Sequence, residues 1–498
     1  MKIITLAVLS ALAFSSHSYA SDLPSLGDAV TQHKSLTTHN ALWLLWPDKQ
    51  IQTVNANQLL IPASTQKLLV TTAAVLALAP DVSFDTELTV TGSLENHVLN
   101  GNIHINYSGD PSFSLDKLHQ LLSELSRLGI KHIAGDIILS HQQLHLPSYP
   151  DERASGWLWD ELSICYAAPV SAFNINGNCQ QASLSAAGLS SSITAIAPNI
   201  LELTSTAQFS DNAECVLRAS QIGVNKTQLS GCINASSTVN LRLAIDSPQA
   251  ANQALIRQWL IAQKITLNGD IRALQQQHEV SQATSVELTT GNTSLIAKKI
   301  MPSRSLQELI QQCLLDSNNL IADSLLKQLG QKTYQEWSFA AGVKAMVSIL
   351  QDAGITLDGA SFEDGSGLSR YNQMTAAQLG QVLQLINSDP KLAVIKRSLP
   401  IAGKSGTLRY KSGFTKEPLA GVVAAKTGGM AGVNNLAGYL TTSQGEVSFV
   451  ILENGVPGTN AIKSQSFPNT RKEQVKPPAA YLSLAPTVLK QVLQQQSH

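Results

Sequence analysis

The stretch from Pro62 to Ala79 constrains the fold of this chain more than any other. After Ser64 it is mostly apolar and built of good helix formers, and Pro80 ends it, because proline cannot continue an α-helix. We therefore predict a buried helix from Ser64 to Ala79. Ser64 and Lys67 are three residues apart, so on this helix they share a face, with Cβ atoms about 5–6 Å apart.

Such a pair holds the elements of an acylating centre. A serine hydroxyl is a weak nucleophile unless a base removes its proton, and a buried lysine whose pKa is lowered by desolvation can be that base. The spacing alone is not specific, because a solvated helix face explains most such pairs. Three other pairs share it, namely Ser114/Lys117, Ser324/Lys327 and Ser388/Lys391.

Two short motifs downstream single out the pair at Ser64. Ser317-Asn318-Asn319 separates two predicted helices, and Lys426-Thr427-Gly428 ends a predicted apolar strand. Together with Ser64-x-x-Lys67 they form the triple pattern of class A β-lactamases and penicillin-binding proteins.

Similar triplets occur at residues 210–212, 404–406 and 411–413. The first lies in a β-rich region, and the other two lie in a Gly/Lys-rich loop with no strand before them. We prefer Ser317, which lies in a loop inside a helical region, and Lys426, which we expect at a sheet edge.

The chemistry requires these residue types. Ser64 attacks a carbonyl carbon and Lys67 takes its proton. Ser317 can pass a proton to the leaving amine with the support of Lys426. The backbone N–H groups of Ser64 and Gly429 can form an oxyanion hole.

The other motif residues are expected to bind substrate. Asn319 can hold the substrate amide and orient Lys67. Lys426 and Thr427, with Gly428 beside them, can bind a free carboxylate through charge and a hydrogen bond.

Composition and the first residues indicate a large exported protein. The chain has 498 residues, about three domains' worth, and its net charge of -1 offers no argument for nucleic-acid binding. Residues 1–20 read as a signal peptide, with Lys2, an apolar stretch from Ile3 to Phe14, and a small-x-small cleavage site ending at Ala20. An uncleaved anchor is the alternative, but the apolar stretch is short for a span. At most peripheral membrane association is expected, and a homodimer is compatible with the sequence.

Export makes disulfides possible. Cys165 and Cys179 form one local pair and Cys215 and Cys232 another, whereas Cys313 has the pattern of a buried free thiol. We predict both local disulfides, although four cysteines allow three connectivities. The histidines are scattered, and no CxxC or HExxH motif is present, so we expect no metal and no cofactor.

The predicted type of secondary structure changes twice along the chain. Residues 21–60 predict a helix, Leu26–His33, and a hairpin of strands Ala41–Trp46 and Ile51–Val54. Residues 84–292 read as a β-rich insertion with a few helices, in which 133–139 is one strand. Helices return after residue 294, then three strands, and a last helix from Leu482 to Gln496, interrupted by Pro486, that packs on the sheet.

These motifs resemble the D-alanyl-D-alanine carboxypeptidase/endopeptidase type of low-molecular-mass, class C penicillin-binding proteins. The resemblance covers most of the mature chain. Beyond the three motifs, it rests on the stretches at residues 109–111, 157–160, 165–169, 364–370 and 434–439.

The resemblance implies an α/β (α+β) fold. The β-lactamase/transpeptidase-like catalytic domain, residues 21–84 and 293–498, would hold a five-stranded antiparallel sheet flanked by helices. Residues 85–185 and 264–292 would form an inserted β-rich domain, and residues 186–263 a second one nested in it.

The resemblance also implies a function: a periplasmic, serine-type carboxypeptidase and DD-endopeptidase with a role in cell wall biogenesis and cell shape. Its partners would be peptidoglycan stem peptides and cross-links, and β-lactam antibiotics would inhibit it. Arg370 would lie near the diaminopimelate end of the substrate, with a structural ion pair as the alternative. A β-lactamase on the same fold and a non-catalytic peptidoglycan-binding protein are the competing hypotheses.

Three positions depart from the family pattern. Gly429 stands where Ser or Thr is usual, so a hydroxyl contact to the substrate carboxylate is lost while the backbone N–H remains. Ala431 replaces a longer polar side chain, and Asn176 falls near where an acidic residue is expected. These departures concern substrate preference rather than acylation.

Overall fold

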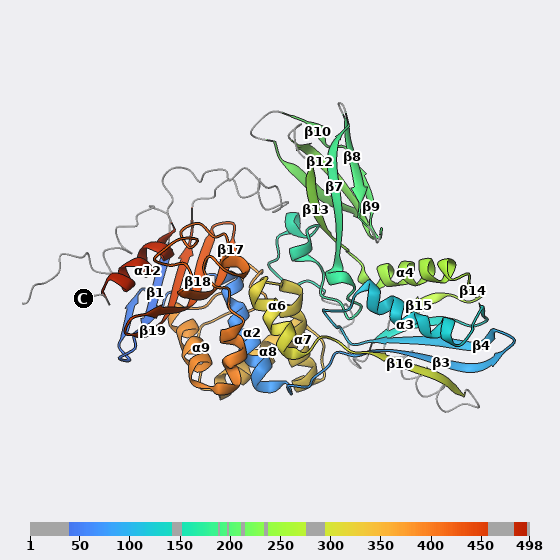
Figure 1. The fold of residues 1–498 in the computed structure, drawn as a ribbon, viewed down its shortest axis with the longest axis horizontal. Helices are drawn as coiled ribbons and strands as arrows, with labels where there is room; N and C mark the ends of the chain where they lie inside the picture. The colour runs from blue at the N-terminus through green and yellow to red at the C-terminus, as the bar shows by residue number, and fades with distance from the viewer. Residues whose placement is uncertain are drawn as a thin grey trace, which may run out of the picture.

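The computed structural model describes residues 39–141, 152–187, 190–196, 199–210, 215–233, 238–274, 294–456 and 483–495. The expected signal peptide and the helix Leu26–His33 lie outside these ranges. Within them, no helix has the length and apolar character needed to cross a bilayer. Figure 1 shows a sheet with its helices at one end of the molecule and the insertion, between α2 and α6, extending away from it.

Both ends of the described chain build one antiparallel sheet. Its order is β17-β18-β19-β1-β2, five strands among the described residues, and every neighbouring pair is antiparallel. The predicted hairpin and the expected sheet are therefore confirmed. The strands are β1 His39–Leu45, β2 Ile51–Val54, β17 Val423–Met430, β18 Val433–Thr442 and β19 Gly445–Asn454.

Helices cover both faces of this sheet, so its central strands are apolar on both sides. Along β1, Trp43 packs among the helices of one face, whereas Leu42 and Leu44 contact the core under the C-terminal helix α12, Leu484–Gln495. The alternation follows from the period of two in a strand. The sequence predicted that Pro486 interrupts the last helix, and this is wrong. Pro486 lies in the first turn of α12, where no backbone N–H is needed, so the helix is continuous.

The helix α2, Lys67–Ala77, lies at the centre of the helical layer, and the helices that it contacts include four of ten or more residues. Each of these four helices is capped at its start by a side-chain oxygen that accepts a backbone N–H of the first turn. The capping residues are Ser305, Asn318, Ser338 and Thr375 respectively. They are α6 Leu306–Leu315, α7 Asn319–Tyr334, α8 Phe339–Asp352 and α9 Ala376–Ser388. These caps explain why the helix starts were readable from the sequence.

The first part of the insertion is a mixed sheet with the helices α3 and α4 along it (Figure 1). Asn102 accepts the N–H of Asp136 between β5 and β6, so the expected single strand 133–139 is two strands. The elements are β3 Thr86–Glu95, β4 Val98–Tyr107, α3 Leu115–Arg127, β5 His132–Ile133, β6 Ile137–His141, α4 Pro248–Ala262, β14 Thr266–Leu267, β15 Ile271–Ala273 and β16 Leu295–Met301.

The second part projects from the first as two smaller sheets, β13-β7-β8 and a group of four around β12 (Figure 1). One apolar core runs through both parts. The strands are β7 Cys179–Ala187, β8 Ser190–Ala195, β9 Glu202–Ser205, β10 Gln208–Phe209, β11 Leu217–Gly223, β12 Lys226–Ile233 and β13 Val239–Ala244.

Strand pairing differs from the expected domain limits at three places. β16, expected in the catalytic domain, pairs with β3 of the inserted sheet. β7 begins before residue 186 and pairs with β13, and α4 packs in the core of the larger sheet rather than with the nested strands alone. The pattern of helix and strand signals along the sequence could not locate these limits, because the partner of a strand can lie far away in the sequence.

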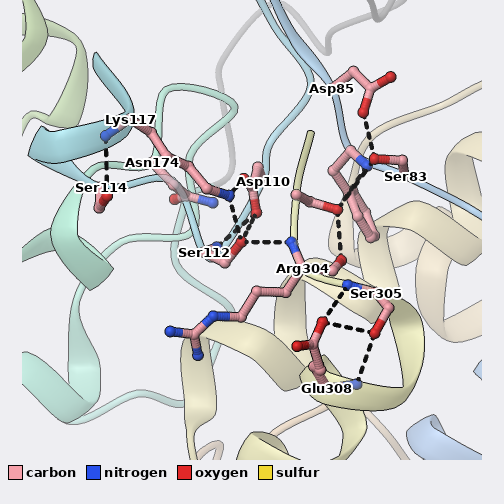
Figure 2. A network of polar contacts seen from close by, with 12 residues as sticks. Ser83, Asp85, Asp110, Ser112, Ser114, Lys117, Asn174, Arg304, Ser305 and Glu308 are labelled. Carbon is pink, nitrogen blue, oxygen red and sulfur yellow. Dashed lines mark hydrogen bonds and ion pairs between the residues drawn. The ribbon is translucent and has the colours of Figure 1, made fainter. Parts of the chain in front are cut away.

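Polar contacts tie the two chain crossings between the catalytic part and the insertion (Figure 2). Where the chain returns, Arg304 donates its N–H to Ser112 Oγ at 3.1 Å, and Ser112 in turn donates to Asp110 at 2.6 Å. Lys117 forms an ion pair with Asp110 at 3.1 Å. Ser114 accepts the backbone N–H of Lys117 as a helix cap, so this Ser/Lys pair is structural.

Candidate active site

Ser64 lies in a single 3₁₀ turn, η1, Ala63–Gln66, which leads directly into α2. The predicted helix is thus a 3₁₀ turn followed by an α-helix. Ser64 is half-buried, whereas the Lys67 side chain is completely buried behind it. Lys67 Nζ lies 2.8 Å from Ser64 Oγ, so the two predicted residues meet.

Two further oxygens surround Lys67 Nζ. Asn319 Oδ1 lies at 2.7 Å and the Ser366 carbonyl oxygen at 2.6 Å. The Asn319 side-chain N–H donates to the Tyr166 carbonyl at 2.8 Å, which fixes the amide with its oxygen toward the lysine. A neutral amine has two hydrogens and one lone pair. The two carbonyl-type oxygens accept the two hydrogens, which leaves the lone pair for the Ser64 hydroxyl.

Burial favours this neutral form. Desolvation lowers the pKa of Lys67, and the weaker opposing charges are those of Cys313, Asp323 and Asp364. Burial also lowers the pKa of Lys426 well below its usual value, and the positive charge of Lys67 lowers it further. Burial therefore disfavours the charged form of both amines.

The second and third motifs meet at Lys426. Its Nζ donates to Ser317 Oγ at 2.8 Å, and Ser317 has a left-handed backbone, φ 57°, between α6 and α7. Lys426 lies within the edge strand β17, which continues through the glycines rather than ending there as expected. Thr427 Oγ1 lies 2.8 Å from Thr407 Oγ1, a partner that the sequence did not indicate.

Two glycines allow this convergence. A Cβ on Gly428 would lie 2.7 Å from the Pro62 carbonyl oxygen, so a side chain there would push β17 off the nucleophile turn. Gly367 has φ 79°, and a Cβ there would lie 1.9 Å from the Ala63 carbonyl oxygen. Gly429, by contrast, is exposed, and a Cβ there would have no neighbour closer than the Val433 carbonyl oxygen at 4.0 Å.

A buried carboxylate supports the Ser366 carbonyl. Asp323 Oδ1 accepts the N–H groups of Gly365 and Ser366, both at 2.8 Å. Burial and the neighbouring Asp364 raise the pKa of Asp323 to about 8. Sequence reasoning missed Asp323, although its place four residues after Asn319 puts both on one helix face.

Arg370 lies at the rim of the pocket. Its Nη1 donates to the Ala431 carbonyl at 2.6 Å. Burial raises the pKa of Glu161, and the positive charge of Arg370 partly offsets this, so the two groups lie close together. The acidic group beside Arg370 is thus Glu161. Asn176, which falls near where an acidic residue was expected from the family pattern, accepts the N–H of Leu115 at 2.9 Å.

The structure pairs the cysteines locally. Cys165 and Cys179 are disulfide-bonded with Cα atoms 5.2 Å apart, and Cys215 and Cys232 with Cα atoms 5.4 Å apart. Cys313 is a buried free thiol. The first disulfide lies next to Tyr166, whose carbonyl orients Asn319.

The other Ser/Lys and Lys-Ser-Gly sequences serve other contacts. Lys327, three residues after Ser324 on α7, donates to the Val170 carbonyl at 3.2 Å and lies 4.4 Å from the Phe339 ring centroid. Lys411 donates to Asn434 Oδ1 at 3.0 Å.

Comparison with known proteins shows the family of this chain. A model of the D-Ala-D-Ala carboxypeptidase 3 (S13) family matches residues 28–474. D-alanyl-D-alanine carboxypeptidase DacB of Haemophilus influenzae is 33% identical over 410 residues, 80% of this chain and 82% of the relative. The crystal structure of penicillin binding protein 4 from Haemophilus influenzae matches with a TM-score of 0.79 and 29% identity, covering 95% of this chain and 99% of that one. Its complex with a β-lactam matches with a TM-score of 0.74 and 28% identity, at the same coverage. This chain therefore belongs to the D-Ala-D-Ala carboxypeptidase 3 (S13) family, among the class C low-molecular-mass penicillin-binding proteins, and is a serine peptidase.

Proposed function

We propose that this enzyme removes the terminal D-Ala from peptidoglycan stem peptides through an acyl-Ser64 intermediate, and that it also cleaves the D-Ala–diaminopimelate cross-link. The observation that carries the proposal is the environment of Lys67 Nζ, with two fixed acceptors and one hydroxyl within 2.8 Å. This arrangement aims a lone pair at the half-buried Ser64 hydroxyl.

In the first step Ser64 Oγ forms a bond to the carbonyl carbon of the penultimate D-Ala, and its proton moves to Lys67 Nζ. The carbonyl oxygen becomes negative between the backbone N–H groups of Ser64 and Gly429. General-base assistance of this kind contributes about 10²–10⁴-fold to a rate.

In the second step the C–N bond breaks and the amine leaves with a proton from the Ser317 hydroxyl, which Lys426 replaces. A substrate carboxylate held by Lys426 and Thr427 offsets the burial of the ammonium and favours its charged form. Binding of a substrate with a free carboxylate thus favours Lys426 as a proton donor. Water then attacks the acyl carbon, the bond from that carbon to Ser64 Oγ breaks, and Ser64 Oγ takes back the proton held on Lys67, while the acid product gives its proton to solvent.

Glu161 and Arg370, at the rim of the pocket, support recognition of the diaminopimelate residue of the stem peptide. This residue carries an ammonium and a carboxylate on one carbon, and Glu161 and Arg370 offer charges of opposite sign at one place. The amine released from a cross-link also bears an adjacent carboxylate, so Lys426 and Thr427 could hold either leaving group. The exposed, side-chain-free Gly429 leaves room for the larger one.

The cellular setting is part of the proposal. The composition of residues 1–20 supports export to the periplasm, where the enzyme would act in cell wall biogenesis and cell shape. Osmotic-shock fractionation with an antibody against the protein would test this, and a purely cytoplasmic signal would contradict it.

The function is tested by incubating the enzyme with fluorescent penicillin and, separately, with stem pentapeptide. We expect a mass increase on the peptide containing Ser64, release of D-Ala, and loss of both in Ser64→Ala. Fast penicillin turnover without D-Ala release would favour a β-lactamase. Peptidoglycan binding without either reaction, unchanged in Ser64→Ala, would favour a binding protein.

A further inference from the structure

A second cavity, of about 570 Å³, lies beside the active site. One wall is the segment 159–166, which includes η2, Trp159–Glu161. The opposite wall is formed by residues 216–221, mostly from β11, and by Ser230 of β12. We call this cavity the lateral groove.

The lateral groove shares a wall with the active site. Tyr166 lines the groove, and its backbone carbonyl holds the Asn319 side chain that contacts Lys67. Glu161, close to Arg370 at the rim of the active site, also lines the groove. A ligand anchored at Ser64 and extending past this rim would therefore enter the lateral groove.

The two walls differ in chemistry. Trp159 is 84% exposed, although the burial of an indole ring is normally favourable, so a flat aromatic surface faces solvent at the groove. On the opposite wall Arg218 and Ser230 are direct partners across the β11–β12 ladder, so both side chains point to the same face of the sheet. One side of the groove is an aromatic plane, and the other carries hydrogen-bond donors and acceptors.

This combination fits a pyranose ring. A sugar presents a face of C–H groups that stacks on an aromatic plane, and hydroxyl and acetamido groups around its edge that bond to arginine and serine. A peptide strand fits less well. Among the described strands β11 pairs only with β12, but its ladder shifts register between Gln221 and Gly223, and such a bulge disrupts the edge for strand addition.

We propose that the lateral groove binds the N-acetylated saccharide of peptidoglycan, with Trp159 stacked on a sugar ring, while the attached stem peptide occupies the active site. This proposal rests on the proposed function, since it needs a peptide linked to a glycan. It assigns a role in substrate choice to the nested part of the insertion, because β11 and β12 supply the polar wall.

The experiment compares two substrates, the free pentapeptide and the same pentapeptide linked to a disaccharide of N-acetylglucosamine and N-acetylmuramic acid. For the unmodified enzyme we expect a kcat/KM about 3–10-fold higher for the disaccharide-linked substrate, the contribution of one aromatic contact. In Trp159→Ala this advantage disappears, while kcat/KM for the free pentapeptide and the rate of penicillin acylation stay within twofold. Ile222→Ala, which removes an exposed apolar side chain of β11 outside the groove, keeps the full advantage.

A second variant tests the opposite wall. Ser230→Trp fills the groove and should abolish the advantage with unchanged penicillin acylation. An unmodified enzyme without preference for the disaccharide, or a Trp159→Ala variant that loses the same factor on both substrates, would overturn the saccharide proposal. Failure to release D-Ala from either substrate would instead overturn the proposed function.

Discussion

Replacing Lys67 by methionine tests whether this amine is the base for Ser64. Methionine has a similar length and no charge, so it can fill the buried space without a proton acceptor. Because Nζ lies 2.8 Å from Ser64 Oγ and no other base is assigned to that hydroxyl, the variant should lose the general-base contribution. That contribution is about 10²–10⁴-fold, or about 2.7–5.5 kcal/mol in activation free energy.

The assay is the second-order rate of labelling by fluorescent penicillin, followed by quenching and a denaturing gel. Labelling isolates acylation, whereas D-Ala release also depends on hydrolysis of the acyl-enzyme. Asn319 Oδ1 and the Ser366 carbonyl lose their donor in the variant, so thermal unfolding is recorded in parallel to verify that the protein is folded.

The chain offers a matched control. Lys327 is buried and has the same spacing from Ser324 as Lys67 has from Ser64, but its contacts include the Val170 carbonyl and the Phe339 ring. Lys327→Met should lower the unfolding temperature while acylation stays within about threefold of the unmodified rate. Folded Lys67→Met protein that is labelled within tenfold of that rate would refute the assignment.

Three further outcomes follow from the site. Burial lowers the pKa of Lys67, so the neutral fraction of this amine, and with it the acylation rate, should rise with pH and level off below the ordinary lysine pKa of about 10.4. A pH–rate profile that levels off only above that value would contradict this. Gly429→Ser fits sterically, since the nearest atom to its Cβ is the Val433 carbonyl oxygen at 4.0 Å, and should lower KM about 2–10-fold for a peptide with a free carboxylate but not for its amide. The double variant Cys165→Ser/Cys179→Ser should lose about 3 kcal/mol in urea unfolding, as estimated for a loop of about this length, and added dithiothreitol should destabilise it less than the unmodified protein, because only the Cys215–Cys232 disulfide remains to be reduced.

Local patterns made much of this protein predictable. The hairpin of β1 and β2, the helices after residue 305 and the C-terminal helix follow from hydrophobic periodicity and from caps such as Ser305. These signals depend only on residues a few positions apart, so they can be recognised in a single sequence. The three motifs identified Ser64, Ser317 and Lys426 because few residue types can perform acyl transfer.

The sequence by itself thus determined the elements and the chemical groups of the site. Only the tertiary structure decided which copy of a repeated pattern is used. Ser64/Lys67 and Ser324/Lys327 have identical spacing, and both lysines are buried. Of these two lysines, however, Lys67 is the one that lies within hydrogen-bond distance of its serine and of Asn319, 252 positions away in the sequence. It also decided that Asp323 accepts the N–H groups of Gly365 and Ser366, that Glu161 lies near Arg370, and that β16 joins the inserted sheet. The physical reason is that these contacts arise from packing between distant segments, and their energies depend on the shape of the whole core rather than on neighbours along the chain.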